Sequence, residues 1–122
     1  MNPKFWLRAG SILMFLGVAA GAFGAHGLKN FLSPEMKQVY ETGVKYQIYH
    51  ALALLLLSVI APRTPNPWVE RAGFSFLIGI FLFSGSLYAL SLSGIKKFGF
   101  ITPLGGLAFL AGWAFLSISS FN

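Results

Sequence analysis

The chain has 122 residues, and with 56% hydrophobic and 10% charged residues it cannot cover the surface of a soluble fold, which is normally about 25% charged. Its formal net charge of +6 comes from bases that lie between apolar runs, which disfavours nucleic-acid binding and favours contact with the lipid bilayer and its anionic headgroups. The absence of cysteine excludes disulfides, thiolate nucleophiles and thiolate metal sites.

The first apolar run extends from Phe5 to about Ala25 and is interrupted only by Arg8. About 20 apolar residues in a helix cross a hydrocarbon core of about 30 Å. The same stretch also has features of a secretory signal, with basic residues before it and small residues at its end. We expect a retained membrane span over residues 5–26.

A second helix is predicted to start after a polar connection. Ser33 can cap it, Pro34 suits the first helical position, and Glu35 favours the positive end of the helix dipole. Residues 34–45 are therefore expected to form an amphipathic helical lead-in. Charges recur every four residues on one face of it, at Lys37, Glu41 and Lys45.

The second span is predicted over residues 43–61. Its purely apolar part, residues 51–61, is too short to cross a bilayer, so the span must include polar residues nearer its start. Gln47 and His50 then lie at the hydrocarbon edge. Because polar groups that face lipid are costly, both side chains are expected to point into the bundle.

The third span is predicted over residues 70–92 and the fourth over residues 101–121. Asn66 and Thr102 each precede a proline, a pattern typical of a capped helix start. All connections are short or helical, so successive helices should be antiparallel neighbours. The fold class is therefore all-α, a single membrane domain of four helices with both termini on the same side.

Small residues at helical spacing predict where these helices touch, because they let backbones approach closely in a membrane. Faces of this kind that are not used internally could also pair with copies of the chain, giving a homo-oligomer. The glycines expected to pack are Gly17, Gly21, Gly24, Gly79, Gly85, Gly105 and Gly112.

Alternating spans also bring polar residues to one membrane face, where the first and third spans end and the second and fourth begin. Three interpretations follow: hydrogen bonds that hold helices together, a site that binds or conducts a proton, ion, small solute or lipid headgroup, or an enzyme site built on a three-ligand zinc ion. The members of this polar cluster are His26, Glu41, Tyr46, Gln47, Tyr49, His50, Tyr88 and Thr102, with Ser84 and Ser86 beside them.

Four segments carry a resemblance to a known family. They are residues 21–28 (GAFGAHGL), 40–54 (YETGVKYQIYHALAL), 82–88 (LFSGSLY) and 101–113 (ITPLGGLAFLAGW). Their order and content resemble the YgdD- and YwdK-like small membrane proteins, the domain of unknown function 423 or UPF0382-type family. The resemblance implies a four-span protein of the bacterial inner membrane, and it supplies no reaction and no functional residues.

The sequence contains no catalytic motif, no His-Glu-x-x-His helix and no phosphate-binding loop after a strand. We therefore expect no enzyme activity, no catalytic residues, no metal and no cofactor. The predicted function is that of a non-enzymatic membrane component or scaffold. The alternative is binding or transport of a small solute, proton, ion or lipid headgroup through the polar cluster.

Overall fold

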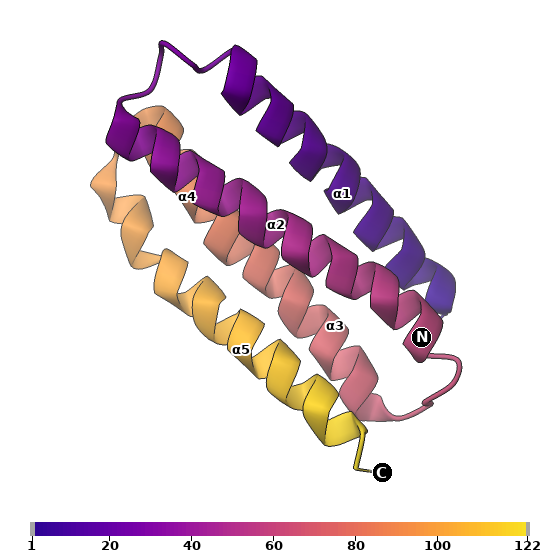
Figure 1. Cartoon of the computed structure of the whole chain (residues 1–122). Helices are drawn as coiled ribbons and strands as arrows, with labels where there is room; N and C mark the ends of the chain where they lie inside the picture. Colours follow the sequence, from indigo (N-terminus) through magenta and orange to yellow (C-terminus); the bar gives the residue numbers. More distant parts are fainter. Residues whose placement is uncertain (1, 122) are drawn as a thin grey trace.

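The computed structural model describes residues 2–121, and within them every regular element is a helix (Figure 1). The all-α prediction is confirmed. The third rod is built from three segments that run on without a break. In chain order the elements are α1 (Pro3–His26), α2 (Pro34–Ile60), α3 (Pro67–Gly79), the π-helical turn η1 (Ile80–Ser84), α4 (Gly85–Ser93), the 3₁₀ turn η2 (Lys96–Phe100) and α5 (Thr102–Ser119).

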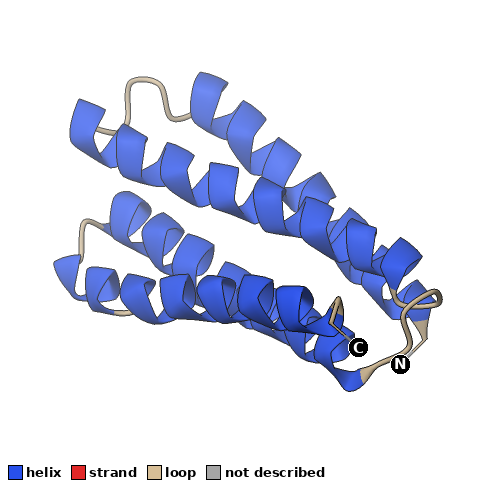
Figure 2. Ribbon diagram, turned by 60° about the horizontal axis from the view of Figure 1, so that its bottom comes forward, coloured by secondary structure: helices blue, strands red, loops and turns tan. Residues whose placement is uncertain are grey.

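Four helical rods are long and apolar enough to cross a membrane, as predicted: Pro3–His26, Pro34–Ile60, Pro67–Ser93 and Lys96–Ser119. The residues at which each helix enters and leaves the bilayer stay a prediction. Figures 1 and 2 show that α1 begins and α5 ends at the same end of the bundle. The placement of both termini on one side of a membrane is therefore geometrically consistent and also stays a prediction.

Two of the three predicted helix caps are present. The Ser33 hydroxyl accepts a hydrogen bond from the Met36 amide at 3.2 Å. Asn66 accepts one from the Trp68 amide at 2.9 Å. These side chains satisfy amide groups that the first turn of a helix leaves without partners.

The prediction of a cap at Thr102 is wrong. The turn η2 leads directly into α5, so the amide groups of Ile101 and Leu104 already donate to the carbonyls of Phe98 and Ile101. The Thr102 hydroxyl is left for another partner and lies 2.6 Å from the Ser86 hydroxyl on α4. It joins two helices instead of capping one.

The bundle consists of two layers (Figure 2). In one layer α1 packs along α2, and in the other α3 and η1 pack along α5 while α4 packs against η2. Helix α2 also contacts α3, η1 and α4, so it is the main connection between the layers. Near the end where α1 begins, α1 reaches the second layer through Trp6, which is fully buried against Gly73 and Phe74. The indole N–H of Trp6 has no acceptor within residues 2–121.

Six of the seven glycines that were expected to pack lie against another helix. Those of α1 face α2: Gly17 lies against Ile48 and Gln47, Gly21 against Val44, and Gly24 against the Tyr40 ring. In the second layer, Gly79 lies under Phe109, Gly112 under Phe76, and Gly105 against the backbone of Phe83.

The packing prediction is wrong for Gly85. A Cβ atom at this position would meet nothing within 4 Å. Gly85 follows the π-helical turn, and its amide donates to the Ile80 carbonyl, the wide bond that closes the turn. The extra residue in that turn leaves Gly85 on the wall of an open groove rather than against a neighbouring helix.

Candidate functional site

His50 lies in the middle of the bundle with only 4% of the residue exposed. Its Nδ1 atom is 2.8 Å from the Tyr46 carbonyl oxygen, and the Trp113 indole N–H donates to Nε2 at 3.0 Å. Because Nε2 accepts a hydrogen bond, the proton of the neutral ring lies on Nδ1, which then donates to the carbonyl. One face of the ring stacks on Phe109, with centroids 3.6 Å apart and planes at 6°.

Gln47 is 5% exposed and connects three helices. Its Nε2 amide donates to the Leu13 carbonyl of α1 at 2.8 Å, and its Oε1 atom accepts a hydrogen bond from the Tyr88 hydroxyl of α4 at 2.6 Å. The prediction that Gln47 and His50 point into the bundle is confirmed. Gln47 finds both partners in neighbouring helices, and His50 finds one in α5 and one in its own helix, so neither side chain needs a partner that lipid could not provide.

The Gln47 bonds belong to a larger network around α2. The Tyr40 hydroxyl donates to the Ala20 carbonyl of α1 at 2.5 Å, and the Ser84 hydroxyl donates to the Gly43 carbonyl at 2.7 Å. The rings of Tyr40 and Tyr88 lie 5.4 Å apart. We call Tyr40, Gln47, Ser84 and Tyr88 the interhelical network, since their four bonds all join different helices.

Tyr40 and Trp113 were not among the predicted members of the polar cluster. A signal for Tyr40 exists in the sequence, because Tyr40, Gly43, Gln47 and His50 follow one another at steps of three and four, which places them on one stripe of α2. Trp113 has no such signal, since an indole within an apolar run is equally typical of a lipid-facing anchor.

The remaining predicted members are divided between different surroundings. Tyr49 is 54% exposed on the outer side of α2, with its ring edge to face with that of Tyr46 at 5.6 Å. Tyr46 is 37% exposed and faces the second layer, where its ring lies 4.7 Å from that of Phe83. Thr102 bonds to Ser86 between α4 and α5. None of these three touches the interhelical network through a hydrogen bond that the described residues show.

The structure does not bring His26 and Glu41 to the other members, so the prediction of a single cluster is wrong. Both residues are exposed. Gly24, next to the end of α1, faces Tyr40, which is ten residues before His50 and therefore about 15 Å away along the helix axis. Assigning both histidines to one membrane face predicted that they lie at the same end of the bundle. It did not determine how far along the helix axis each one lies.

Two open grooves flank α2. The one on the α5 side has a volume of about 620 Å³ and the one on the α1 side about 320 Å³. Both have chiefly apolar walls and open outward between helices, where lipid would lie. The larger is lined by Tyr46, His50, Phe83, Pro103, Gly106, Leu107, Phe109, Leu110 and Trp113, and the smaller by Leu13, Leu16, Ala20, Gln47, Ile80, Phe81, Ser84, Gly85 and Tyr88.

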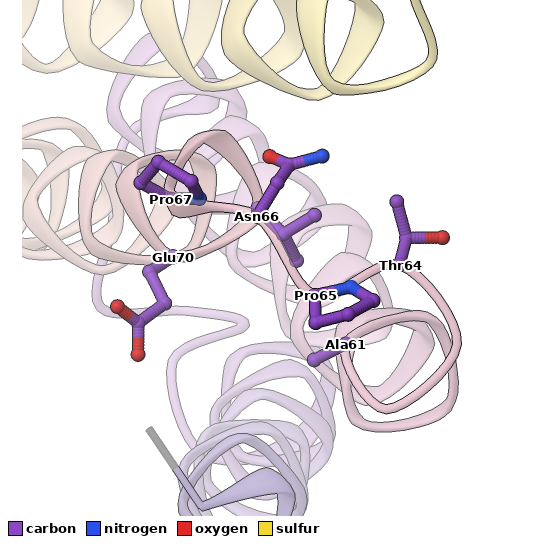
Figure 3. A pocket seen from close by; sticks show the side chains of 7 residues that line it. Ala61, Thr64, Pro65, Asn66, Pro67 and Glu70 are labelled. Atoms are coloured by element: carbon purple, nitrogen blue, oxygen red, sulfur yellow. The ribbon is translucent and has the colours of Figure 1, made fainter. Parts of the chain in front are cut away.

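A third depression of about 320 Å³ lies at the loop between α2 and α3 (Figure 3). Figure 3 shows the Glu70 carboxylate and the Thr64 hydroxyl pointing in different directions from this loop. The Asn66 amide is used elsewhere, donating to the Ser119 carbonyl at 3.2 Å. The depression is a space between prolines and a helix start, and its polar groups do not converge on one point.

Within residues 2–121, no three His, Cys, Asp or Glu side chains come together in a way that could hold a metal ion. His26, His50 and a glutamate were the only candidates for the three-ligand zinc site considered from the sequence, and the two histidines are separated as described above. The polar side chains that do converge make hydrogen bonds between helices.

Comparison with known proteins gives consistent matches over most of the chain. The family described as "Protein of unknown function (DUF423)" matches residues 20–106. A UPF0382 membrane protein of Staphylococcus haemolyticus is 45% identical over 119 residues, covering 98% of this chain and 97% of the relative. YwdK of Bacillus subtilis, a UPF0382 membrane protein, is 42% identical over 118 residues, covering 96% of each chain.

The UPF0382 inner membrane protein YgdD of Escherichia coli K12 is 40% identical over 120 residues, covering 98% of this chain and 92% of the relative. No solved structure matches the chain. The names of these relatives describe a membrane location and no reaction.

Proposed function

We propose that this chain, which belongs to the DUF423 family, is a non-enzymatic component of the bacterial cell membrane whose bundle serves as a packed scaffold. The chain is a multi-pass membrane protein with four helices able to cross the bilayer. Its buried polar side chains hold the helices in one arrangement.

The bonding of His50 is the observation that carries this proposal. A histidine that relays protons or binds an ion needs a free nitrogen or a lone pair directed at the ligand. Here one nitrogen donates to the Tyr46 carbonyl and the other accepts from Trp113. Protonation of Nε2 would break the Trp113 bond, so the bonded state favours a neutral, structural imidazole.

The interhelical network supports the same role. Gln47 uses its amide nitrogen on α1 and its amide oxygen on α4, and Ser84 bonds to the backbone of α2. Hydrogen bonds between membrane helices contribute only about 0.6 kcal/mol each on average, but they select one packing among several of similar energy. A scaffold needs such a single arrangement.

The rival function is passage of a small solute, proton or ion beside His50. The observation that favours it is the groove of about 620 Å³ that reaches this residue between α2 and α5. The walls of that groove are mostly aromatic and aliphatic, which suits an acyl chain better than a hydrated ion.

Flux measurements in reconstituted liposomes separate the two functions. The purified protein is incorporated at known density, and proton and potassium flux are followed with a pH-sensitive dye under an imposed gradient. A scaffold predicts flux equal to that of protein-free liposomes for both the wild type and His50→Ala. A pathway predicts flux in the wild type that His50→Ala abolishes and Tyr49→Ala, on the outer side of α2, retains; that result would overturn the scaffold proposal.

Lipids and copies of the chain are the partners that fit this role. The outward surfaces of α1 and α5 are apolar, with Phe15 and Leu110 among the most exposed side chains. Such surfaces contact acyl chains or the same surface of another copy. The proposal includes no nucleic-acid partner, because the basic residues lie between apolar runs.

A further inference from the structure

A small groove lies where the end of α1 meets the first turns of α2. Its volume is about 170 Å³, and it is separate from the two grooves that flank the middle of α2. We call it the α1–α2 groove. It is lined by Gly21, Gly24, Ala25, Leu32, Lys37, Tyr40, Glu41, Val44 and Lys45.

The floor of the α1–α2 groove is apolar and made largely of small residues. Gly21 and Gly24 bring α1 close to α2, where they face Val44 and Tyr40. Ala25 and Leu32 continue the floor toward the loop between the helices. A floor of this kind offers van der Waals contact to the glycerol backbone and the first carbons of an acyl chain, and it offers nothing to a free inorganic anion.

The rim of the same groove is charged. Lys37, Glu41 and Lys45 are spaced four residues apart, so they follow one face of α2 over about 12 Å. Two ammonium groups and one carboxylate give the rim a formal charge of +1. Because Gln47 lies just inside the hydrocarbon edge deduced for this helix, the rim stands at the level of the headgroups.

From this combination we propose that the α1–α2 groove binds one monoanionic phospholipid of the phosphatidylglycerol type. The phosphodiester, with one negative charge, accepts hydrogen bonds from the lysine ammonium groups and matches the charge of the rim. The hydroxyls of the glycerol headgroup donate to the Glu41 carboxylate. The upper acyl chain lies on the floor formed by Gly21, Gly24 and Ala25.

This site does not depend on the scaffold proposal, because it shares no side chain with His50 or its partners and shares only Tyr40 with the interhelical network. Lipid selectivity and liposome flux are also independent readouts, so either proposal can fail alone. The occupant is a membrane lipid and not a soluble phosphate, since the apolar floor forms half of the site.

Native mass spectrometry of the intact protein in detergent tests the proposal. Phosphatidylglycerol and phosphatidylethanolamine with the same acyl chains are added at equal concentration, and the bound fractions give their affinity ratio. A lysine near a membrane surface changes anionic lipid affinity about fivefold, so Lys37→Gln/Lys45→Gln should lower the preference for phosphatidylglycerol roughly thirtyfold. The control is Lys96→Gln/Lys97→Gln, which removes two exposed charges of η2 outside the groove.

Equal loss in both double variants would overturn the proposal, because it would mean that only the overall charge matters. A second variant tests the floor. Ala25→Phe fills the groove at an exposed position of α1 and should remove the bound lipid, whereas Ala19→Phe, exposed on another face of α1, should keep it. Retention of lipid by Ala25→Phe, or its displacement by millimolar glycerophosphate, would also reject the site.

Discussion

The two helical hairpins of the bundle begin alike and are closed differently. Each starts with Asn-Pro, and the Asn2 and Asn66 side chains accept hydrogen bonds from the amides of Lys4 and Trp68, both at 2.9 Å. Each then carries Arg-Ala-Gly, at residues 8–10 and 71–73. Both hairpins also enter the bundle at the same end and in the same direction (Figure 1).

In the first hairpin, polar side chains of α2 reach the backbone of α1 in addition to the glycine contacts between the two helices. Tyr40 donates to the Ala20 carbonyl and Gln47 to the Leu13 carbonyl. The second hairpin is held chiefly by rings over glycines, Phe109 against Gly79 and Phe76 against Gly112, with hydrogen bonds near its two ends. The difference teaches that close packing of membrane helices can be specified by hydrogen-bond donors aimed at backbone oxygens or by steric fit. Substitutions that disrupt these two kinds of contact should lower the free energy of unfolding by different amounts.

The largest effect is expected in the second hairpin, from Gly105→Ala. A Cβ atom at Gly105 would overlap the backbone of Phe83, which cannot move away as a flexible side chain could. Overpacking of this kind costs about 1–3 kcal/mol or more. The matched control is Gly106→Ala, whose Cβ would meet its nearest atom at 3.9 Å.

The measurement is the free energy of unfolding in mixed micelles, followed by circular dichroism during titration with a denaturing detergent. Equal stability of the two glycine variants would show that the packing of α5 does not depend on its close approach to Phe83. Steric fit would then not be what holds the second hairpin together.

A smaller effect is expected from Gln47→Leu. The substitution removes the bonds to Leu13 and Tyr88 and leaves the Tyr88 hydroxyl without its acceptor. A loss of about 1–2 kcal/mol is expected, near the upper limit for single hydrogen bonds between membrane helices. A double-mutant cycle with Tyr88→Phe isolates the Gln47–Tyr88 term, and purely additive losses would mean that this bond contributes nothing.

The smallest effect is expected from Tyr40→Phe, which removes one hydroxyl and keeps the ring that faces Gly24. The average hydrogen bond between membrane helices predicts a loss of about 0.6 kcal/mol. Tyr49→Phe is the control, because this residue is 54% exposed on the outer side of α2. If both variants unfold alike in the same titration, the polar closure of the first hairpin rests on Gln47 alone.

Local features of the fold were predictable because they depend on neighbouring residues. The caps at Ser33 and Asn66 followed from a polar residue before a proline. The same pattern failed at Thr102, because a preceding 3₁₀ turn supplies the carbonyls that a cap would otherwise replace. Whether a turn of that kind is present depends on how α4 and α5 approach each other, which the local sequence does not contain.

For the candidate site, the sequence predicted which side chains point into the bundle but not which residues they bond to. Counting apolar residues showed that Gln47 and His50 must lie inside the bundle, and both are buried. Grouping by membrane face then placed His26 with His50, although the end of α1 lies against much earlier turns of α2. Axial depth depends on how far α1 slides along α2, and the Gly24–Tyr40 contact that sets it is a tertiary one.

The π-helical turn at Ile80–Ser84 has a consequence for the length of the third rod. A π-helical turn holds one residue more than an α-helical turn. The side chains after it therefore point in the directions they would have in a regular α-helix that lacked that residue. Relatives could therefore lose a single residue between positions 80 and 84 without rotating Ser84 or Tyr88 away from α2. The same loss within α5 would turn all later side chains by about 100°.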